Sequence, residues 1–154
     1  AQATKYLEQS KIRNGWEFTT QHVARPHNLI DMEIYKRAIK LWIDKGERLN
    51  YANLPSELQK HNNKQAFLNR FQVVNHDGFC HTVVAHIAMD GHYYIYPSLK
   101  QVRSITVREA ARIQSFPDDY FFEGSRSAAF KQIGNAVPVV LAHKIAEEIK
   151  KMLI

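Results

Sequence analysis

The period of the hydrophobic residues changes along this chain, and that change restricts the fold more than any other feature. From Asp31 to Ile43, apolar side chains recur at the spacing of an amphipathic helix. From Phe67 to Pro97 they alternate in short runs rich in β-branched and aromatic residues, as in β-strands. Helical spacing returns after Thr106. The pattern predicts an α+β fold, in which a small antiparallel β-hairpin sheet is flanked by helices and a long helix ends the chain.

Local signals predict where the first helices begin and end. Asp31 is a candidate N-cap, and Gly46 would take the left-handed conformation that closes the helix. Pro55 would start a short helix through Leu58, because proline fits a first helical turn.

The last helices have equally clear signals. Thr106 and Glu109 have the spacing of a capping box, and Pro117 would stop the helix that they start. A final helix would run from Pro138 to Met152. Its apolar stripe consists of Leu141, Ile145, Ile149 and Met152. This stripe needs a partner surface, either the hairpins or another polypeptide.

Turn signals divide the alternating region. Asp77-Gly78 and Asp90-Gly91 lie between its runs, so we expect two strands linked by a hairpin and then a third strand. The run Tyr93–Tyr96 fits packing within a strand better than the stacking of bases.

Charge and cysteine content restrict the partners and the setting. The 154 residues include 21 Lys and Arg against 15 Asp and Glu, which gives a net charge of +6. This excess favours a polyanionic partner, and a basic surface without such a partner is the alternative. A single cysteine cannot form an internal disulfide, which favours a reducing, cytoplasmic setting. The chain has neither an apolar run of transmembrane length nor the apolar core of a signal peptide at its start, so we expect no membrane.

Two segments near the end of the chain carry a family resemblance. Residues 103–120 read RSITVREAARIQSFPDDY and residues 130–138 read FKQIGNAVP. In this order and at this separation they resemble motifs nine and ten of DNA cytosine-5 methyltransferases. Such enzymes flip a cytosine out of the duplex and methylate its ring carbon 5 from S-adenosylmethionine. Residues 82–97 resemble the final part of the family's target-recognition domain, and residues 22–27, with Asp31 and Tyr35, resemble its beginning.

The resemblance implies a division of the chain. Residues 1–104 would form the target-recognition domain, 105–132 the motif nine helix and loop, and 133–154 motif ten with the helix that returns to the catalytic domain. Asn135 and Ala136 would line the cavity for the cofactor and the flipped base, and Gly134 would allow close backbone approach there. The alternative for Asn135 is that it caps the last helix.

Several residues are candidates for contact with double-stranded DNA. Arginine suits guanine edges and phosphates, and polar side chains of the recognition domain could also contact DNA. Arg126 and Lys131 are expected in the loop before motif ten. The DNA-binding candidates are Arg25, Arg70, Thr82, His86, Arg103, Arg126 and Lys131. For the basic ones, a solvated or salt-bridged surface role is the alternative, and Arg108 and Arg112 could instead pair with Glu109 or Asp118.

The family's catalytic motifs do not occur in this chain. The Phe-x-Gly-x-Gly cofactor loop, the Pro-Cys dipeptide that supplies the nucleophile and the Glu-Asn pair are all missing from the sequence. Cys80 lies outside that context and is expected to be structural, so we predict no catalytic residue here. The histidines lack the spacing of a zinc site, so we predict no metal ligand either.

The sequence therefore favours the recognition and closing portion of a DNA cytosine-5 methyltransferase. Its partners would be double-stranded DNA and an N-terminal catalytic domain or subunit, and S-adenosylmethionine would bind only in the complete enzyme. The portion alone is expected to be inactive. The alternatives are a stand-alone DNA-binding or interaction module and a degenerate remnant, with a homodimer through the last helix as one way to cover its stripe.

Overall fold

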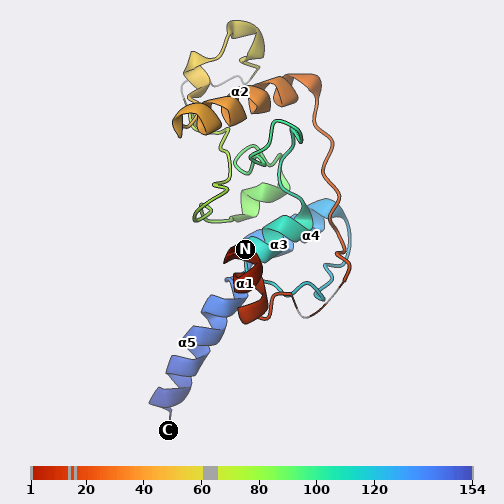
Figure 1. The fold of residues 1–154 in the computed structure, drawn as a ribbon, viewed down its shortest axis with the longest axis vertical. Helices are drawn as coiled ribbons and strands as arrows, with labels where there is room; N and C mark the ends of the chain where they lie inside the picture. Colours follow the sequence, from red (N-terminus) through yellow and green to blue (C-terminus); the bar gives the residue numbers. More distant parts are fainter. Residues whose placement is uncertain (1, 14, 16, 61–65, 154) are drawn as a thin grey trace. The chain divides into compact units, whose positions relative to one another are not determined.

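The computed structural model describes residues 2–13, 15, 17–60 and 66–153. The chain divides into two compact units. Unit 1 comprises residues 1–23, 83–89 and 106–154, and unit 2 comprises residues 24–82 and 90–105. Figure 1 shows the elements of both units in sequence colours.

Helix α2 (Leu29–Lys45) is the main element of unit 2. The prediction that Asp31 caps it is wrong, because the helix begins earlier. Asn28 is the N-cap, and its side-chain oxygen accepts a hydrogen bond from the Asp31 N–H at 2.8 Å. Asp31 instead lies in the first turn, where a carboxylate is favoured by the helix dipole. The predicted C-cap is confirmed, since Gly46 has a φ of 67° and its N–H donates to the carbonyl of Trp42.

The core of unit 2 is built on the buried face of α2. Ile34, Tyr35, Ala38 and Ile39 on that face belong to one apolar cluster. The other buried members are Leu49, Tyr51, Leu54, Leu58, Phe71, Val73 and Ile95. Two 3₁₀ helices, η1 (Tyr51–Asn53) and η2 (Ser56–Leu58), contribute to it. The short helix predicted after Pro55 is confirmed as η2, with Pro55 at its N-cap.

The predicted β-hairpin sheet is wrong: the described part of the chain contains no strand. Residues 67–105 make only two isolated bridges, a parallel one between Val73 and Ile95 and an antiparallel one between Ile95 and Ser104. A parallel pair cannot come from a tight hairpin. The alternating pattern nevertheless reports burial, since Val73 and Ile95 are both in the core. Short runs interrupted by turns bury their apolar residues without extending into a ladder.

Unit 1 contains the remaining helices. These are α1 (Gln2–Gln9), the 3₁₀ helix η3 (Ala85–Ala88), α3 (Val107–Ile113), α4 (Arg126–Asn135) and α5 (Val139–Met152). Helix α4 packs against both η3 and α3. The capping box of α3 is confirmed, because Thr106 accepts from the Glu109 N–H and Glu109 accepts from the Thr106 N–H. Helix α3 ends at Ile113, before Pro117, and is closed by Ser115 in the left-handed region with a φ of 55°.

The two arginines of α3 have different environments. Of the alternatives open for Arg112, the structure shows an ion pair with Asp118, and both contacts to that carboxylate are 2.8 Å long. The Asp118 side chain is 2% exposed, and this hydrogen bond raises the pKa of Arg112. Arg108 is fully buried, and its guanidinium donates to neutral oxygens of Thr20, Pro117 and Tyr120. Burial lowers the pKa of Arg108.

Helix α4 corrects two sequence predictions. Arg126 and Lys131 lie on this helix and not in a loop, because Ser125 caps it by accepting from the Ala128 N–H at 3.2 Å. Asn135 is the last residue of α4 and does not cap α5. The N-cap of α5 is Pro138, which makes no side-chain capping bond.

The predicted final helix is confirmed as α5, and it has no buried residue. Figure 1 shows it extending away from α3 and α4 of the same unit. Along its apolar stripe, Leu141, Ile145 and Ile149 are each about half exposed and Met152 is 82% exposed. Within the described residues, nothing covers this stripe. None of the helices among the described residues combines the length and the apolar character that a membrane span requires.

Candidate functional site

The turn between α4 and α5 carries the two residues predicted to line a cofactor cavity. Asn135 is exposed and Ala136 is half-buried, and Val137 beside them is 58% exposed. The turn thus presents an amide, a small side chain and an apolar side chain to the outside of unit 1. This arrangement could form one side of a site for a ligand with polar and apolar parts.

Gly134 lies where α4 crosses η3. A Cβ atom on this residue would lie 2.7 Å from the carbonyl oxygen of Val84 and 2.7 Å from the Cα of Ala85. The close backbone approach that glycine permits here is therefore to η3 and its preceding residue. Glycine at this position therefore lets α4 pack closely against η3.

Gln114, which follows α3, contacts the same turn and was not singled out by the sequence. Its side-chain amide is buried and donates to the carbonyls of Ile133 at 3.2 Å and Ala136 at 3.1 Å. These acceptors lie 19 and 22 residues away along the chain, and backbone carbonyls leave no sequence signature. No local pattern could have identified this role.

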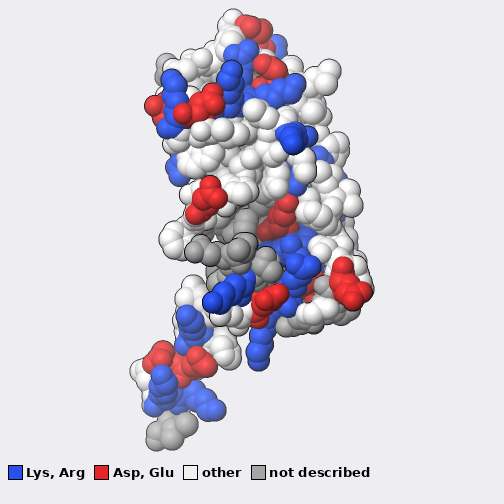
Figure 2. Space-filling view, viewed as in Figure 1, with Lys and Arg blue, Asp and Glu red and all other residues white. Residues whose placement is uncertain are grey.

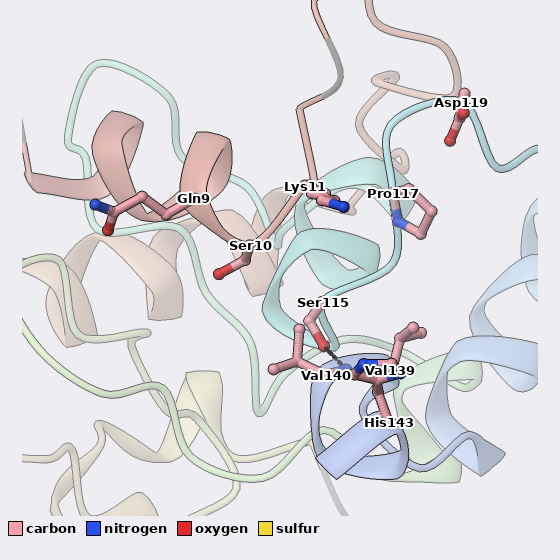
Figure 3. Close-up of a pocket in the computed structure, with 9 residues that line it drawn as sticks. All are labelled: Gln9, Ser10, Lys11, Ser115, Pro117, Asp119, Val139, Val140 and His143. Atoms are coloured by element: carbon pink, nitrogen blue, oxygen red, sulfur yellow. Dashed lines mark hydrogen bonds between the residues drawn. The ribbon is translucent and has the colours of Figure 1, made fainter. Parts of the chain in front are cut away.

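A pocket of about 550 Å³ lies beside the turn but does not include Asn135 or Ala136. Figure 3 shows its lining, which comes from three parts of unit 1. These are residues 9–11, the segment after α3 with Ser115, Pro117 and Asp119, and the start of α5 with Val139, Val140 and His143. The first turns of α5 thus form one wall of a recess.

The seven predicted DNA-binding residues fall into two groups. Thr82, His86, Arg126 and Lys131 are exposed. Of these, His86 lies on η3 and the two cations lie on α4, so three exposed candidates come from a packed pair of elements.

Arg25, Arg70 and Arg103, all in unit 2, are less exposed. Arg70 is 8% exposed, stacks over the Tyr51 ring at 4.3 Å and donates to the Phe67 carbonyl. Arg103 is half-buried and lies over the Tyr96 ring at 4.0 Å. Arg25 is half-buried near Gly91.

Both signs of charge occur on the surface. On the face drawn in Figure 2, lysines and arginines lie next to acidic residues, including those along α5. On α5 itself, Lys151 pairs with Glu148 at 2.7 Å and His143 approaches Glu147 at 3.2 Å. The net positive charge is therefore not gathered into one uniform patch on this face.

A partly buried chain of hydrogen bonds joins His27, near the beginning of unit 2, through the Tyr35 hydroxyl to His92. The Ser104 N–H donates to His27 Nε2 at 3.2 Å, and the Tyr35 hydroxyl lies 2.8 Å from His92 Nδ1. Burial raises the pKa of Tyr35, so its hydroxyl keeps the proton and can donate to His92. These histidines thus form hydrogen bonds within unit 2. Among the described residues, no group of three His, Cys, Asp or Glu could hold a metal ion.

Cys80 has the environment expected of a structural cysteine. It is half-buried, and burial raises its pKa to about 11. A nucleophilic cysteine needs the opposite shift, because the thiolate is the reactive form.

We therefore expect slow alkylation of Cys80 in the folded chain at pH 8, and a rate that rises with pH up to about 11. The urea-unfolded chain should react much faster at pH 8, because its thiol has a lower, ordinary pKa. Mass spectrometry of iodoacetamide-treated samples measures both rates. Equal rates in the folded and unfolded chains at pH 8 would contradict the shift.

Comparison with known proteins gives the family. The model of the family described as C-5 cytosine-specific DNA methylase matches residues 2–151. Type II methyltransferase M.Bpa9945I of Bacillus paralicheniformis is 51% identical over 134 residues, which are 87% of this chain and 30% of that protein. Putative type II methyltransferase M.OihORF3336P of Oceanobacillus iheyensis is 41% identical over 125 residues, 81% of this chain and 27% of that protein. The chain thus spans less than a third of the length of these relatives. It belongs to the C-5 cytosine-specific DNA methylase family.

Proposed function

We propose that this chain is the DNA-recognition and closing portion of a type II DNA cytosine-5 methyltransferase. The complete enzyme would transfer a methyl group from S-adenosylmethionine to cytosine in double-stranded DNA. One observation carries the proposal: the family match extends over nearly the whole chain, yet the chain spans less than a third of each relative and lacks the cofactor loop and the Pro-Cys nucleophile.

The exposed stripe of α5 supports a missing partner segment. A helix with a continuous apolar face and no buried residue is unusual in a self-sufficient domain, because such a face is stabilised only when it is covered. We propose that the catalytic portion of the enzyme packs against the apolar stripe of α5. An autonomous module would instead cover the stripe within the chain or in a homodimer. Equilibrium sedimentation distinguishes these, since a homodimer through α5 would dissociate when Ile145 is replaced by aspartate.

The α4–α5 turn is the part of this chain that would meet the cofactor. Asn135 offers an exposed amide that can donate and accept hydrogen bonds, and Ala136 leaves room beside it. These residues fit one wall of a site for S-adenosylmethionine, which supplies the methyl group when bound. The rest of that site would come from the catalytic portion. We keep the predicted boundaries of the three parts: the target-recognition domain would comprise residues 1–104, the motif nine helix and loop 105–132, and motif ten with the last helix 133–154.

The exposed candidates are the stronger ones for phosphate contact. Arg126 and Lys131 are exposed on α4, the helix that precedes the turn, and neither forms an ion pair within the described part of the chain. His86 is exposed on η3, and Thr82 is exposed just before it in the chain. Arg25, Arg70 and Arg103 would need to give up present packing or hydrogen bonds to reach DNA.

The isolated chain is expected to bind duplex DNA weakly, with an affinity that falls steeply with salt because phosphate contacts release counterions. Replacing Lys131 with glutamine should reduce the slope of log K against log[salt] by about 1 if it contacts one phosphate. Replacing Lys150 on α5 is the matched control and should leave the slope unchanged. Fluorescence anisotropy at several salt concentrations measures the slopes. Salt-independent binding would mean that the basic residues do not face DNA.

The function is tested by complementation. The purified chain should transfer no methyl group from labelled S-adenosylmethionine to DNA. Addition of the upstream portion of a close relative, carrying the cofactor loop and the Pro-Cys nucleophile, should restore transfer. Turnover by the chain alone would disprove its dependence on a partner. No transfer by any such combination would favour a stand-alone DNA-binding module or a remnant.

A further inference from the structure

We propose that Gln114 is a positioning residue for the cofactor: its buried amide fixes the direction in which the α4–α5 turn presents Asn135. The proposal rests on the function proposed above. Gln114 would touch neither cofactor nor DNA and would act through the backbone of the turn.

The two acceptors of the amide lie on either side of Asn135. Nε2 donates to Ile133 O at 3.2 Å and to Ala136 O at 3.1 Å. The same Ile133 carbonyl accepts from the Ala136 N–H at 3.2 Å. One side chain therefore holds both ends of the short segment that contains Gly134 and Asn135. Because the amide is buried, water cannot readily replace it.

The residues just after the turn are tied to the same place. The Val139 N–H donates to the Gln114 carbonyl at 3.1 Å, and the Val140 N–H donates to the Ser115 hydroxyl at 3.0 Å. Figure 3 draws the second of these bonds. The first N–H groups of a helix need acceptors, and Pro138 supplies no side-chain cap. Gln114 and Ser115 thus cap α5 from outside it.

The end of α3 is itself held firmly. The Ser115 N–H donates to Arg112 O at 3.0 Å and the Phe116 N–H to Ala111 O at 2.9 Å, which is a Schellman closure. Glycine is the usual residue at this left-handed position, yet the chain has Ser115 there with a φ of 55°. A non-glycine residue keeps this conformation only where surrounding contacts determine it. The hydrogen bond from the Val140 N–H to the Ser115 hydroxyl is one such contact, and a glycine at this position could not accept it.

The test is replacement of Gln114 with glutamate in the complete enzyme formed with the catalytic portion. The shape is kept, but an ionised carboxylate cannot donate to the two carbonyls. We expect the KM for S-adenosylmethionine to rise about tenfold or more, since small misplacements of a binding group have effects of this order. The KM for DNA should change less than twofold. At lower pH the KM for the cofactor should partly recover, because a protonated carboxyl regains one O–H donor.

The control is replacement of Gln59 with glutamate in unit 2. Gln59 also donates to backbone carbonyls, those of Ala52 at 3.2 Å and Leu54 at 2.7 Å, but it lies outside the unit that contains the turn. Its substitution should leave the KM for S-adenosylmethionine unchanged. Replacing Gln114 with methionine removes the donors without adding charge and should raise the KM for the cofactor without any recovery at low pH.

The outcomes separate the two proposals. Methyl transfer by the wild-type enzyme together with an unchanged KM for the cofactor in both Gln114 variants would overturn the positioning role and leave the function standing. Equal changes in both KM values and in kcat, without recovery at low pH, would mean that Gln114 only stabilises the fold. Failure of both variants to fold would lead to the same conclusion. Absence of transfer by the wild-type assembly would overturn both proposals.

Discussion

Replacement of Arg108 with methionine is expected to lower the free energy of unfolding by about 3–5 kcal/mol, because each buried oxygen left without its donor costs about 1–3 kcal/mol. The arginine is fully buried, and its guanidinium donates to the carbonyls of Thr20, Pro117 and Tyr120 and to the Thr20 hydroxyl. Methionine would fill much of the volume but leave these oxygens without donors. Urea denaturation followed by circular dichroism measures the loss.

A matched substitution shows that the effect comes from burial. Arg126 is exposed on α4, so its replacement with methionine should change the free energy of unfolding by less than about 0.5 kcal/mol. Replacement of Arg108 with lysine should still be costly, because a single ammonium cannot reach acceptors arranged around a planar guanidinium. A loss below about 1 kcal/mol for Arg108 to methionine would show that the buried hydrogen bonds contribute little net stability.

The predictions that succeeded depend on a few adjacent residues. The capping box of Thr106 and Glu109 and the left-handed Gly46 act through bonds within one helical turn, so the sequence contains the whole signal. Asn28 was missed because Asp31 has the same capping chemistry.

The β-sheet prediction failed because alternation reports burial and not pairing. Val73 and Ile95 are buried as their pattern suggests, but they make only isolated bridges, Val73 with Ile95 and Ile95 with Ser104. The run after Val83 forms η3 instead of a strand, because that segment packs against α4. Tertiary packing determines whether such a segment forms a strand or irregular backbone. The local sequence does not contain the residues against which the segment packs.

The candidate site, too, could be predicted only in part from the sequence. The motif ten turn could be found from its residues, but the contacts that hold it could not. Gln114 reaches carbonyls 19 and 22 residues away, and the neighbour of Gly134 is the backbone of η3. Only the folded chain brings these groups together.

Replacement of Gly134 with alanine is expected to lower the free energy of unfolding by about 2 kcal/mol or more, although alanine is the better helix former. The new Cβ would lie 2.7 Å from Val84 O and 2.8 Å from Val84 C, as well as 2.7 Å from Ala85 Cα. Backbone atoms cannot rotate away as a side chain can, so α4 and η3 must separate. The gain in helix propensity, about 1 kcal/mol, offsets only part of this cost. Urea denaturation of both proteins gives the difference.

Ser127 provides the matched control, because it is exposed on the same helix and its replacement with alanine meets no neighbouring backbone. That variant should be as stable as the wild type or slightly more stable, by a few tenths of a kcal/mol. In the complete enzyme, the Gly134 variant should also bind S-adenosylmethionine more weakly, because separation of α4 from η3 displaces Asn135 at the adjacent position. A Gly134 variant as stable as the wild type would mean that η3 does not pack against α4 as closely as the contacts require. In that case the hydrogen bonds made by Gln114 and Ser115 would hold the turn without the contact to η3.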